Sequence, residues 1–370
     1  MMAAITAAAN GHQVTLMEKN DRLGKKLAIT GGGRCNLSNA TDPEGLIQNV
    51  KTNPSFLYSA FYTFGSSDLV EFFENRGLPL KVENGRIFPK SDRAADVVAV
   101  LEETLKKSDV KILLNHTVKD IKFLLKNSAV IVATGGVSYP STGSTGDGYR
   151  WAKELGHKIV EPRPALVPLL ADVQGLAGLS LKNVGLKLNS YYGQGELLFT
   201  HKGISGPVVM EASHYWDSKH EAAIDLMPDF NQTELDKLIL KAFEESPNKF
   251  VGNIIEKFLP KRLVPMIVDF ADKQANAVTK NERTQLITKI KAMPIKITGT
   301  AGFKEAVITA GGVDVQEINP SDMSSKKVSG LYFAGEVIDV DAATGGFNLQ
   351  IAFSTGYQAG CSVGRREDYD

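Results

Sequence analysis

The first twenty residues show a change of pattern from a helix to a strand. Residues 1–9 are a run of good helix formers, and Asn10-Gly11 is a typical stop signal at a helix end. Residues 13–19 then alternate between apolar and polar positions and carry an acid, Glu18, near their end. A helix that leads into a strand ending in Asp or Glu is typical of the rear part of a dinucleotide-binding βαβ unit. The pattern predicts such a unit, although no strand and no G-x-G-x-x-G turn stand before it.

The segments that follow alternate between strand and helix patterns. Residues 83–107 predict a turn, a short strand and a helix that is capped near Ser91 or Asp92. Residues 128–136 include an unbroken apolar run, which is typical of a strand buried on both faces. A glycine-rich loop at 141–148 then leads into a helix, whose cap we expect near Asp147.

The character of the chain changes near residue 161. Several prolines and strand-like segments predict a β-rich part over 163–230, and residues 231–294 are polar and rich in helix patterns. Strand patterns return in 295–370, which ends as strand, loop and helix. We therefore expect one α/β domain that begins with residues 1–162, is interrupted by an insertion, and is completed by the C-terminal segment.

The amino-acid composition argues against several classes of function. The 370 residues carry a formal net charge of zero, which argues against binding to DNA or to a membrane surface by bulk charge. No apolar run reaches membrane-spanning length, and no signal peptide pattern is present. Only Cys35 and Cys361 are present, without a C-x-x-C pair, which favours the reducing cytoplasm.

The closing segment has the pattern most typical of flavin binding. An apolar strand ends in Gly335-Glu336, and a glycine pair then leads into a helix that starts near Phe347 or Asn348. A helix N-terminus can stabilise the negative charge that builds up on a reduced flavin ring, and glycines allow the backbone to approach it. The alternative is an ordinary glycine-led helix cap, which we consider the weaker interpretation.

A second candidate loop is the stretch "ITGGGRCNLSN". Gly32 and Gly33 belong to three successive glycines, and Arg34 offers a guanidinium suited to phosphate. The alternative is a plain glycine loop. Cys35 beside Arg34 is more often structural than a redox thiol.

Other candidates carry weaker signals. The tetrapeptide "ATGG", which contains Thr134 and Gly135, ends a buried strand. His201 is the best-placed histidine for acid–base work, although a lone histidine in a glycine-proline turn is more often structural. We find no metal-ligand spacing, and no second G-x-G-x-x-G for a dedicated NAD(P)H domain. If NAD(P)H is the reductant, we expect it to bind only transiently, at the face of the flavin.

Six stretches together resemble a known family, the HI-type (YhiN-like, BaiN/RdsA) bacterial flavoproteins, described as NAD(P)/FAD-dependent oxidoreductases. They are "EKNDRLGKKLAITGGGRCNLSN", "GRIFPKSDRA", "VIVATGGVSYPSTGSTGDGY", "LLFTHKGISGP", "GTAGFKEAVITAGGV" and "GLYFAGEVIDVDAATGGFNLQIAFSTGYQAG". The resemblance implies a discontinuous Rossmann-like FAD-binding domain with inserted β-barrel-like and helical subdomains.

The resemblance also implies roles for single residues. Glu18 would bind the adenosine ribose, the backbone of Val118 would lie near the adenine, and Gly335 and Glu336 would lie on the cofactor's linker. The expected set near the rest of FAD comprises Lys19, Gly32, Gly33, Arg34, Cys35, Asn36, Thr134 and Gly135, with Gly346, Phe347, Asn348, Leu349 and Gln350 at the flavin ring.

The sequence departs from the family pattern at two places. The first strand and its glycine fingerprint are absent, and the hairpin expected between His116 and Ala129 is shortened. We expect residues upstream of the given sequence to supply the first feature. A real loss would instead predict weak FAD binding and poor stability.

Three functions remain open from the sequence. The main hypothesis is a flavin-dependent oxidoreductase that acts by hydride transfer at flavin N5 on a small molecule. The second is reduction of uridine to dihydrouridine in ribosomal RNA, for which the locally basic residues 280–297 could follow phosphates. The third is a non-catalytic interaction protein that keeps the fold without tightly bound FAD.

Overall fold

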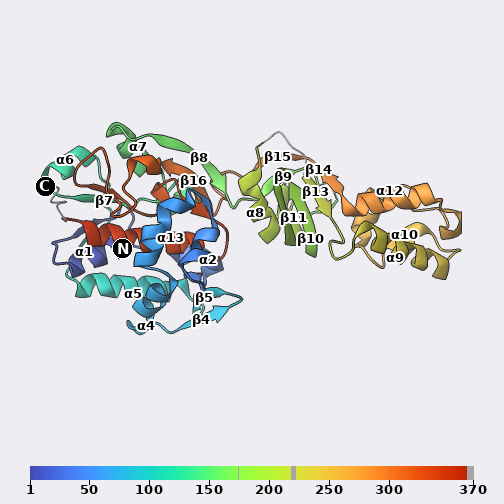
Figure 1. Ribbon diagram of the computed structural model, residues 1–370, viewed down its shortest axis with the longest axis horizontal. Helices are drawn as coiled ribbons and strands as arrows, with labels where there is room; N and C mark the ends of the chain where they lie inside the picture. The colour runs from blue at the N-terminus through green and yellow to red at the C-terminus, as the bar shows by residue number, and fades with distance from the viewer. Residues whose placement is uncertain (174, 218–221, 365–370) are drawn as a thin grey trace. The chain divides into compact units, whose positions relative to one another are not determined.

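The computed structural model describes residues 1–173, 175–217 and 222–364, and its chain forms two compact units (Figure 1). The first unit comprises Met1–Pro164 and Phe303–Asp370, and the second is the continuous segment Ala165–Gly302. The first unit is therefore discontinuous in sequence. The finer subdivision at residues 231 and 295 stays a prediction.

The first unit combines parallel strand pairs with covering helices. Its strands are β1 (Thr15–Met17), β2 (Ser38–Asn39), β3 (Val50–Thr52), β4 (Leu80–Glu83), β5 (Arg86–Pro89), β6 (Lys111–Leu113), β7 (Val130–Val132), β8 (Ile159–Ala165), β16 (Ile308–Val313), β17 (Leu331–Phe333) and β18 (Asp341–Ala342). Strand β1 pairs in parallel with β6, and β17 pairs in parallel with β7. Short strands in parallel pairs need crossover connections, which the helices supply.

The helices of the first unit bring its two chain segments together. They are α1 (Met2–Ala9), α2 (Pro43–Gln48), α3 (Tyr58–Thr63), α4 (Ser66–Glu74), α5 (Ala94–Lys107), α6 (Ile121–Asn127), α7 (Asp147–Glu154) and α13 (Phe347–Ser362). Helices α1 and α13 lie side by side (Figure 1). A Cβ at Gly360 would lie 2.5 Å from the Ala3 carbonyl oxygen, so only glycine allows this close approach.

Smaller pairings complete the first unit. Strands β2, β5 and β4 form an antiparallel sheet in that order, β18 pairs with β3, and β16 pairs with β8. The 3-10 helices of this unit are η1 (Leu27–Gly33), η2 (Pro54–Leu57), η3 (Pro140–Thr142), η7 (Val315–Glu317) and η8 (Gly335–Val337).

The second unit is built on a seven-stranded sheet with the order β14-β13-β10-β11-β12-β9-β15, in which every pair is antiparallel. Its strands are β9 (Leu169–Ala171), β10 (Ser180–Leu188), β11 (Tyr191–Phe199), β12 (Gly203–Ser205), β13 (Ala222–Asp225), β14 (Met293–Ile295) and β15 (Ile297–Thr300). The two edge strands, β14 and β15, are separated only by Lys296. Because successive Cα atoms lie about 3.8 Å apart, the two edges of this sheet must meet, as in a barrel.

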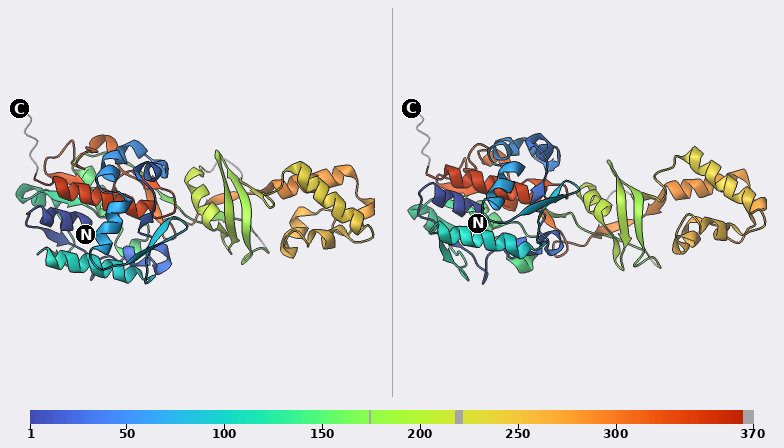
Figure 2. Two further views of the ribbon diagram at one scale, coloured as in Figure 1. Left: turned by 60° about the horizontal axis from the view of Figure 1, so that its bottom comes forward. Right: turned by 90° about the horizontal axis from the view of Figure 1, so that it is seen from below.

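Helices pack against one another beyond the sheet of the second unit (Figure 2). They are α9 (Gln232–Glu245), α10 (Val251–Ile255), α11 (Val264–Ile267) and α12 (Lys280–Lys291), with α8 (Pro207–Ala212) next to β11, and η4 (Ser213–Tyr215), η5 (Lys261–Leu263) and η6 (Ala275–Ala277) as short turns. One hydrophobic cluster joins sheet residues such as Leu186 to helix residues such as Ile239 and Leu286. None of the helices in the described part of the chain is both long and apolar enough to cross a membrane.

The two expected helix caps lie next to the observed ones, although the expected side chains do not form them. Helix α5 starts at Ala94 after Arg93, and neither Ser91 nor Asp92 caps it, because the Asp92 carboxylate bonds to Arg34 and Lys81 instead. Helix α7 does start at Asp147, but its cap is Gly146, and the Asp147 carboxylate pairs with Lys19. Both acids take part in longer-range contacts that local spacing does not reveal.

Candidate functional site

The acid that ends the first strand is held in a turn. Glu18 follows β1, and its N–H donates to the Leu113 carbonyl oxygen at 2.9 Å. Its Oε1 accepts hydrogen bonds from the backbone and side-chain nitrogens of Asn20, both at 2.8 Å. Asn20 Nδ2 also donates to the Thr142 carbonyl oxygen at 2.9 Å. Only one Glu18 oxygen is used by these bonds, so the carboxylate retains acceptor capacity for hydroxyl groups.

Lys19 joins this turn to the start of α7. Its Nζ lies 2.6 Å from Asp147 Oδ2 and also donates to Thr145 Oγ1. Burial raises the Asp147 pKa and Lys19 lowers it, and the net effect is a pKa below the usual range, so the Asp147 carboxylate stays ionised near neutral pH. Lys19 therefore bridges two loops of the first unit, and a direct cofactor contact by its amine stays a prediction.

Glu336 is the centre of a polar network. Its Oε2 lies 2.7 Å from Lys26 Nζ, and its Oε1 accepts from Ser138 Oγ at 2.9 Å and from the Thr309 N–H at 2.7 Å. Thr309 Oγ1 in turn accepts from the N–H groups of Val137 and Ser138. The glutamate therefore ties the tips of β7 and β17 to β16 and to the loop after β1.

The sequence did not single out three residues of this network, namely Lys26, Ser138 and Thr309. Lys26 and Ser138 stand in stretches already chosen, the basic loop after Glu18 and the segment after "ATGG". No sequence pattern around Thr309 indicates its role. It lies in β16, which follows the whole second unit in the sequence and so is far along the chain from Lys26 and Ser138.

The triple-glycine loop has an open backbone. Gly31, Gly32 and Gly33 have φ values of 57°, 66° and 88°, in the left-handed region that disfavours other residues. A Cβ at Gly32 or Gly33 would meet no heavy atom within 4 Å. Conformation rather than crowding therefore requires glycine at these two positions, whereas a Cβ at Gly31 would also lie 2.9 Å from the Asn36 backbone nitrogen. The exposed backbone of Gly32 is free for a ligand to approach.

Arg34 does not present a free guanidinium. Its Nε lies 2.7 Å from Asp92 Oδ1, its NH2 lies 2.7 Å from Glu83 Oε2, and its Cζ lies 4.2 Å from the centre of the Phe88 ring. Lys81 pairs with the same two carboxylates. These four charges sum to zero, so the interpretation of Arg34 as a phosphate ligand stays a prediction without support from its contacts.

Cys35 and Asn36 face the interior. Cys35 is fully buried, and this burial raises the pKa of its thiol to about 12. The thiol is therefore neutral at physiological pH, as expected for a structural rather than a redox cysteine. Asn36 Oδ1 is buried and has no hydrogen-bond partner in the described part of the chain.

The start of α13 lies directly against Asn36. Gly345 and Gly346 have φ values of 127° and 96°, and a Cβ at Gly346 would lie 2.8 Å from Asn36 Oδ1 and clash with the Ser38 carbonyl group. The first N–H groups of a helix have no partner within the helix, and α13 extends over sixteen residues. Its N-terminus therefore offers donors and a positive dipole end beside the glycine pair.

Two residues expected at the ring have side chains that bond within the protein, and their contact with the ring stays a prediction. Gln350 is fully buried, its Oε1 accepts from Ser38 Oγ at 2.5 Å, and its Nε2 donates to the Phe64 carbonyl oxygen and to Ser354 Oγ. Asn348 bonds through both side-chain atoms to the backbone of Ala342 and Ala343. The two side chains therefore fix the start of α13 to neighbouring segments of the chain.

The remaining candidates are placed as follows. Thr134 and Gly135 follow β7, Gly335 begins η8 with a φ of 75°, and Val118 packs against a hydrophobic cluster of the first unit. Phe347 is buried and Leu349 is half-buried in α13. His201 is exposed in the turn between β11 and β12 of the second unit, so a catalytic role stays a prediction.

These features fit a bound FAD. An open glycine backbone, the buried and unpartnered Asn36 Oδ1, and the α13 N-terminus lie in one part of the first unit. No group of three or more His, Cys, Asp or Glu within residues 1–173, 175–217 and 222–364 could hold a metal ion. Free N–H groups at a helix N-terminus beside an open glycine backbone suit an organic anion.

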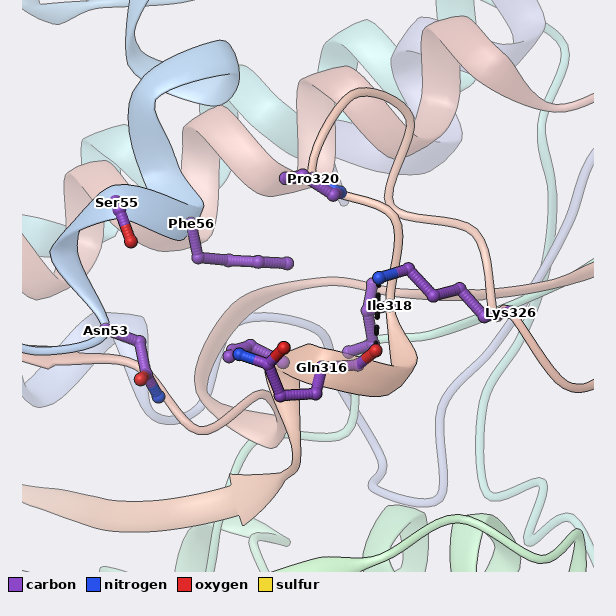
Figure 3. Close-up of a pocket in the computed structure, with 8 residues that line it drawn as sticks. Asn53, Ser55, Phe56, Gln316, Ile318, Pro320 and Lys326 are labelled. Carbon is purple, nitrogen blue, oxygen red and sulfur yellow. Dashed lines mark hydrogen bonds between the residues drawn. The ribbon is translucent and has the colours of Figure 1, made fainter.

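A separate pocket of about 190 Å³ lies in the first unit between the segment after β3 and the loops around η7 (Figure 3). Phe56 and Ile318 form apolar walls, and Lys326 Nζ donates to the Gln316 carbonyl oxygen at 3.1 Å. None of the site residues predicted from the sequence lines it.

A family model described as the HI0933-like protein Rossmann domain matches residues 1–362. The chain belongs to this family. It is 33% identical to the ribosomal RNA dihydrouridine synthase of Haemophilus influenzae, over 99% of this chain and 96% of that protein. It is 31% identical to the protein of that name from Escherichia coli, over 96% of this chain and 93% of that protein.

A relative with a different named activity is equally similar. The 3-dehydro-bile acid delta(4,6)-reductase of Clostridium scindens is 31% identical, over 99% of this chain and 97% of that protein. Among solved structures, an open flavocytochrome c3 fumarate reductase matches with a TM-score of 0.47 and 16% identity, over 98% of this chain and 75% of that chain. Family membership confirms the expected Rossmann-like α/β fold and the class of flavin-dependent oxidoreductase.

Proposed function

We propose that this chain binds FAD in its first unit and uses it as an NAD(P)H-dependent reductase. The observation that carries the proposal is the grouping of the open glycine loop, Asn36 and the N-terminus of α13. Glu18 would bind the ribose hydroxyls and Glu336 the linker, as the family resemblance suggests. FAD, when bound, supplies hydride transfer at flavin N5, and the buried walls around the α13 start would exclude water from it.

The named relatives support a substrate with a reducible carbon–carbon double bond. Dihydrouridine is uridine with two added hydrogens, and a delta(4,6)-reductase also adds hydrogen across ring double bonds. A small unsaturated ring compound is our first candidate. Uridine in ribosomal RNA is the second candidate, because two relatives named for it match nearly the whole chain.

The RNA candidate gains little from the basic stretch at residues 280–297. Arg283 pairs with Asp236 and Lys289 with Asp269, both at 2.6 Å, and Lys291 pairs with Asp225 at the same distance. A lysine or arginine whose charge is already neutralised attracts phosphate less. An ordinary helix whose charges pair within the protein is therefore the better interpretation of α12. We also propose a cytoplasmic location, in keeping with two free cysteines.

The test begins with the visible spectrum of the purified full-length chain. We expect a flavin spectrum and release of FAD on denaturation, and we expect Glu336→Gln to weaken FAD binding. Glu154→Gln, which removes an exposed carboxylate on α7, is the matched control. A colourless protein that takes up no added FAD would overturn the proposal and favour an interaction protein that keeps the fold.

The substrate class can then be tested by following the visible absorbance of the bound flavin. Under anaerobic conditions we expect NADPH or NADH to bleach the flavin, and an unsaturated ring compound to restore its colour. Restoration only by unmodified ribosomal RNA, with a strong dependence on salt, would select the second candidate. Restoration by air alone with release of peroxide would indicate an oxidase.

A further inference from the structure

We propose that Arg34 is a positioning residue of the cofactor site, and that it fixes the glycine loop to the β4–β5 hairpin rather than binding a phosphate. This inference rests on the proposed FAD site. The inference is based on the contacts of the Arg34 guanidinium. Nε and NH2 each lie beside a carboxylate, and the guanidinium lies over the Phe88 ring.

The hairpin offers a rigid partner for this contact. Glu83 ends β4, Phe88 lies in β5, and Asp92 follows β5 with a φ of 55°. Lys81 neutralises the second charge of the cluster through bonds of 2.9 Å to Glu83 and 2.6 Å to Asp92. A guanidinium held by two carboxylates in a neutral cluster has little net attraction left for a phosphate.

The same hairpin also holds the other end of the loop. The Leu37 N–H donates to the Ile87 carbonyl oxygen at 2.8 Å, and β2 continues this pairing from Ser38. The two residues between Arg34 and Leu37 are therefore fixed on both sides. One of them is Asn36, whose buried Oδ1 lies against the glycine pair at the start of α13.

Arginine is required by this geometry. Asp92 Oδ1 accepts from both Nε and NH2 of one planar fork, at 2.7 and 2.5 Å, and NH2 also donates to Glu83 Oε2 at 2.7 Å. The Phe88 ring lies against the face of the guanidinium, with its centre 4.2 Å from Cζ. A lysine is a point charge on a flexible stem and cannot make both contacts and the stacking together, whereas it serves well as a phosphate ligand. If Arg34 positions the loop, Arg34→Lys should weaken FAD binding. If Arg34 binds a phosphate, the same substitution should largely preserve FAD binding.

The decisive experiment measures FAD dissociation constants of full-length variants by flavin fluorescence. In Glu83→Gln/Asp92→Asn both side chains keep their shape but lose their charge, which weakens their hold on Arg34 and leaves its charge uncompensated. We expect FAD binding to weaken about tenfold, Arg34→Lys to weaken it similarly, and the two losses not to add when combined. The visible circular dichroism of the remaining bound flavin should change in the same variants.

A matched control separates positioning from bulk charge. Asp96→Asn/Glu103→Gln removes two carboxylates of α5 that pair with the exposed cations of Arg93 and Lys107, so it changes net charge by the same amount. We expect it to leave FAD affinity within about twofold, because charges exposed to solvent are screened. Thermal unfolding of each variant without FAD should shift little, because ion pairs that are exposed to solvent contribute little to stability.

Two results would overturn the inference. If releasing Arg34 leaves FAD binding unchanged or tightens it, or if Arg34→Lys binds FAD as wild type does, Arg34 is a phosphate ligand or a spectator. A wild-type chain that binds no FAD would instead overturn the proposed function itself, and the inference with it.

Discussion

At the scale of single residues, glycines with the same backbone conformation serve different purposes. Gly346 and Gly77 have φ values of 96° and 80°, which are both left-handed. A Cβ at Gly346 would collide with the backbone of Ser38, whereas one at Gly77 would meet nothing within 4 Å. Gly346 is therefore required both by conformation and by the close approach of β2 to the start of α13.

The pair predicts unequal costs of the same substitution. We expect Gly346→Ala to lower the free energy of unfolding by about 3 kcal/mol, because strain and a backbone collision add. Gly77→Ala should cost about 1 kcal/mol, from conformational strain alone. Urea denaturation of the two variants measures both values. Equal losses at the two positions would show that the backbone around Gly346 relaxes.

Residue-scale prediction from sequence was successful where the signal was local. The helix start near Phe347, the glycine loop and the acid after β1 all depend on neighbours within a few positions, so their patterns are visible in the chain. The partners of Arg34 were not predictable, because Glu83 and Asp92 lie 49 and 58 positions away. The burial of Gln350 was not predictable either, because spacing along a helix start does not reveal which side faces inward.

At the scale of elements, α12 shows how one helix start combines local and distant contacts. Thr279 and Glu282 form a capping box, in which each side chain bonds to the other's backbone N–H. Lys273, from outside the helix, bonds to both Glu282 oxygens at 2.8 and 2.9 Å. These bonds to the charged form lower the Glu282 pKa to about 2.

This lowered pKa predicts a pH-dependent stabilisation. A carboxyl whose pKa falls on folding stabilises the protein above its unfolded pKa of 4.5, and the effect is lost as pH falls toward about 2. Wild type should therefore be more stable than Glu282→Gln at pH 6, and the difference should shrink at pH 3. Urea denaturation at both pH values measures it.

A partner variant provides the control. In a Lys273→Met background the charged partner is absent, so the pH-dependent part of the difference should be smaller. A difference of the same size at pH 6 and pH 3 would contradict a lowered pKa and leave only the helix cap as its cause.

At the scale of the whole molecule, the hydrophobic interior is divided between the two units. One cluster lies entirely within the second unit, and it includes Leu186 of β10, Ile239 of α9 and Leu286 of α12. The other two clusters consist only of residues of the first unit. A segment with its own core and an intact sheet meets the physical requirements for folding alone.

We expect a fragment of residues 165–302 to unfold in one cooperative transition, followed by circular dichroism. Leu186→Asp should abolish the transition, because this side chain is fully buried in the cluster. Leu198→Asp is the matched control on the neighbouring strand, since Leu198 is 37% exposed. A fragment without a cooperative transition would show that its core is insufficient by itself.

The pairing of β9 with β15 has a consequence for how the gene could acquire its insertion. The Ala301 N–H donates to the Pro168 carbonyl oxygen at 2.9 Å, so the chain enters and leaves the second unit at neighbouring points. A domain whose two ends are adjacent can be inserted into a surface loop of another domain without separating the two ends of that loop. Replacement of the second unit by a short turn would for the same reason leave the path of the first unit's chain unchanged.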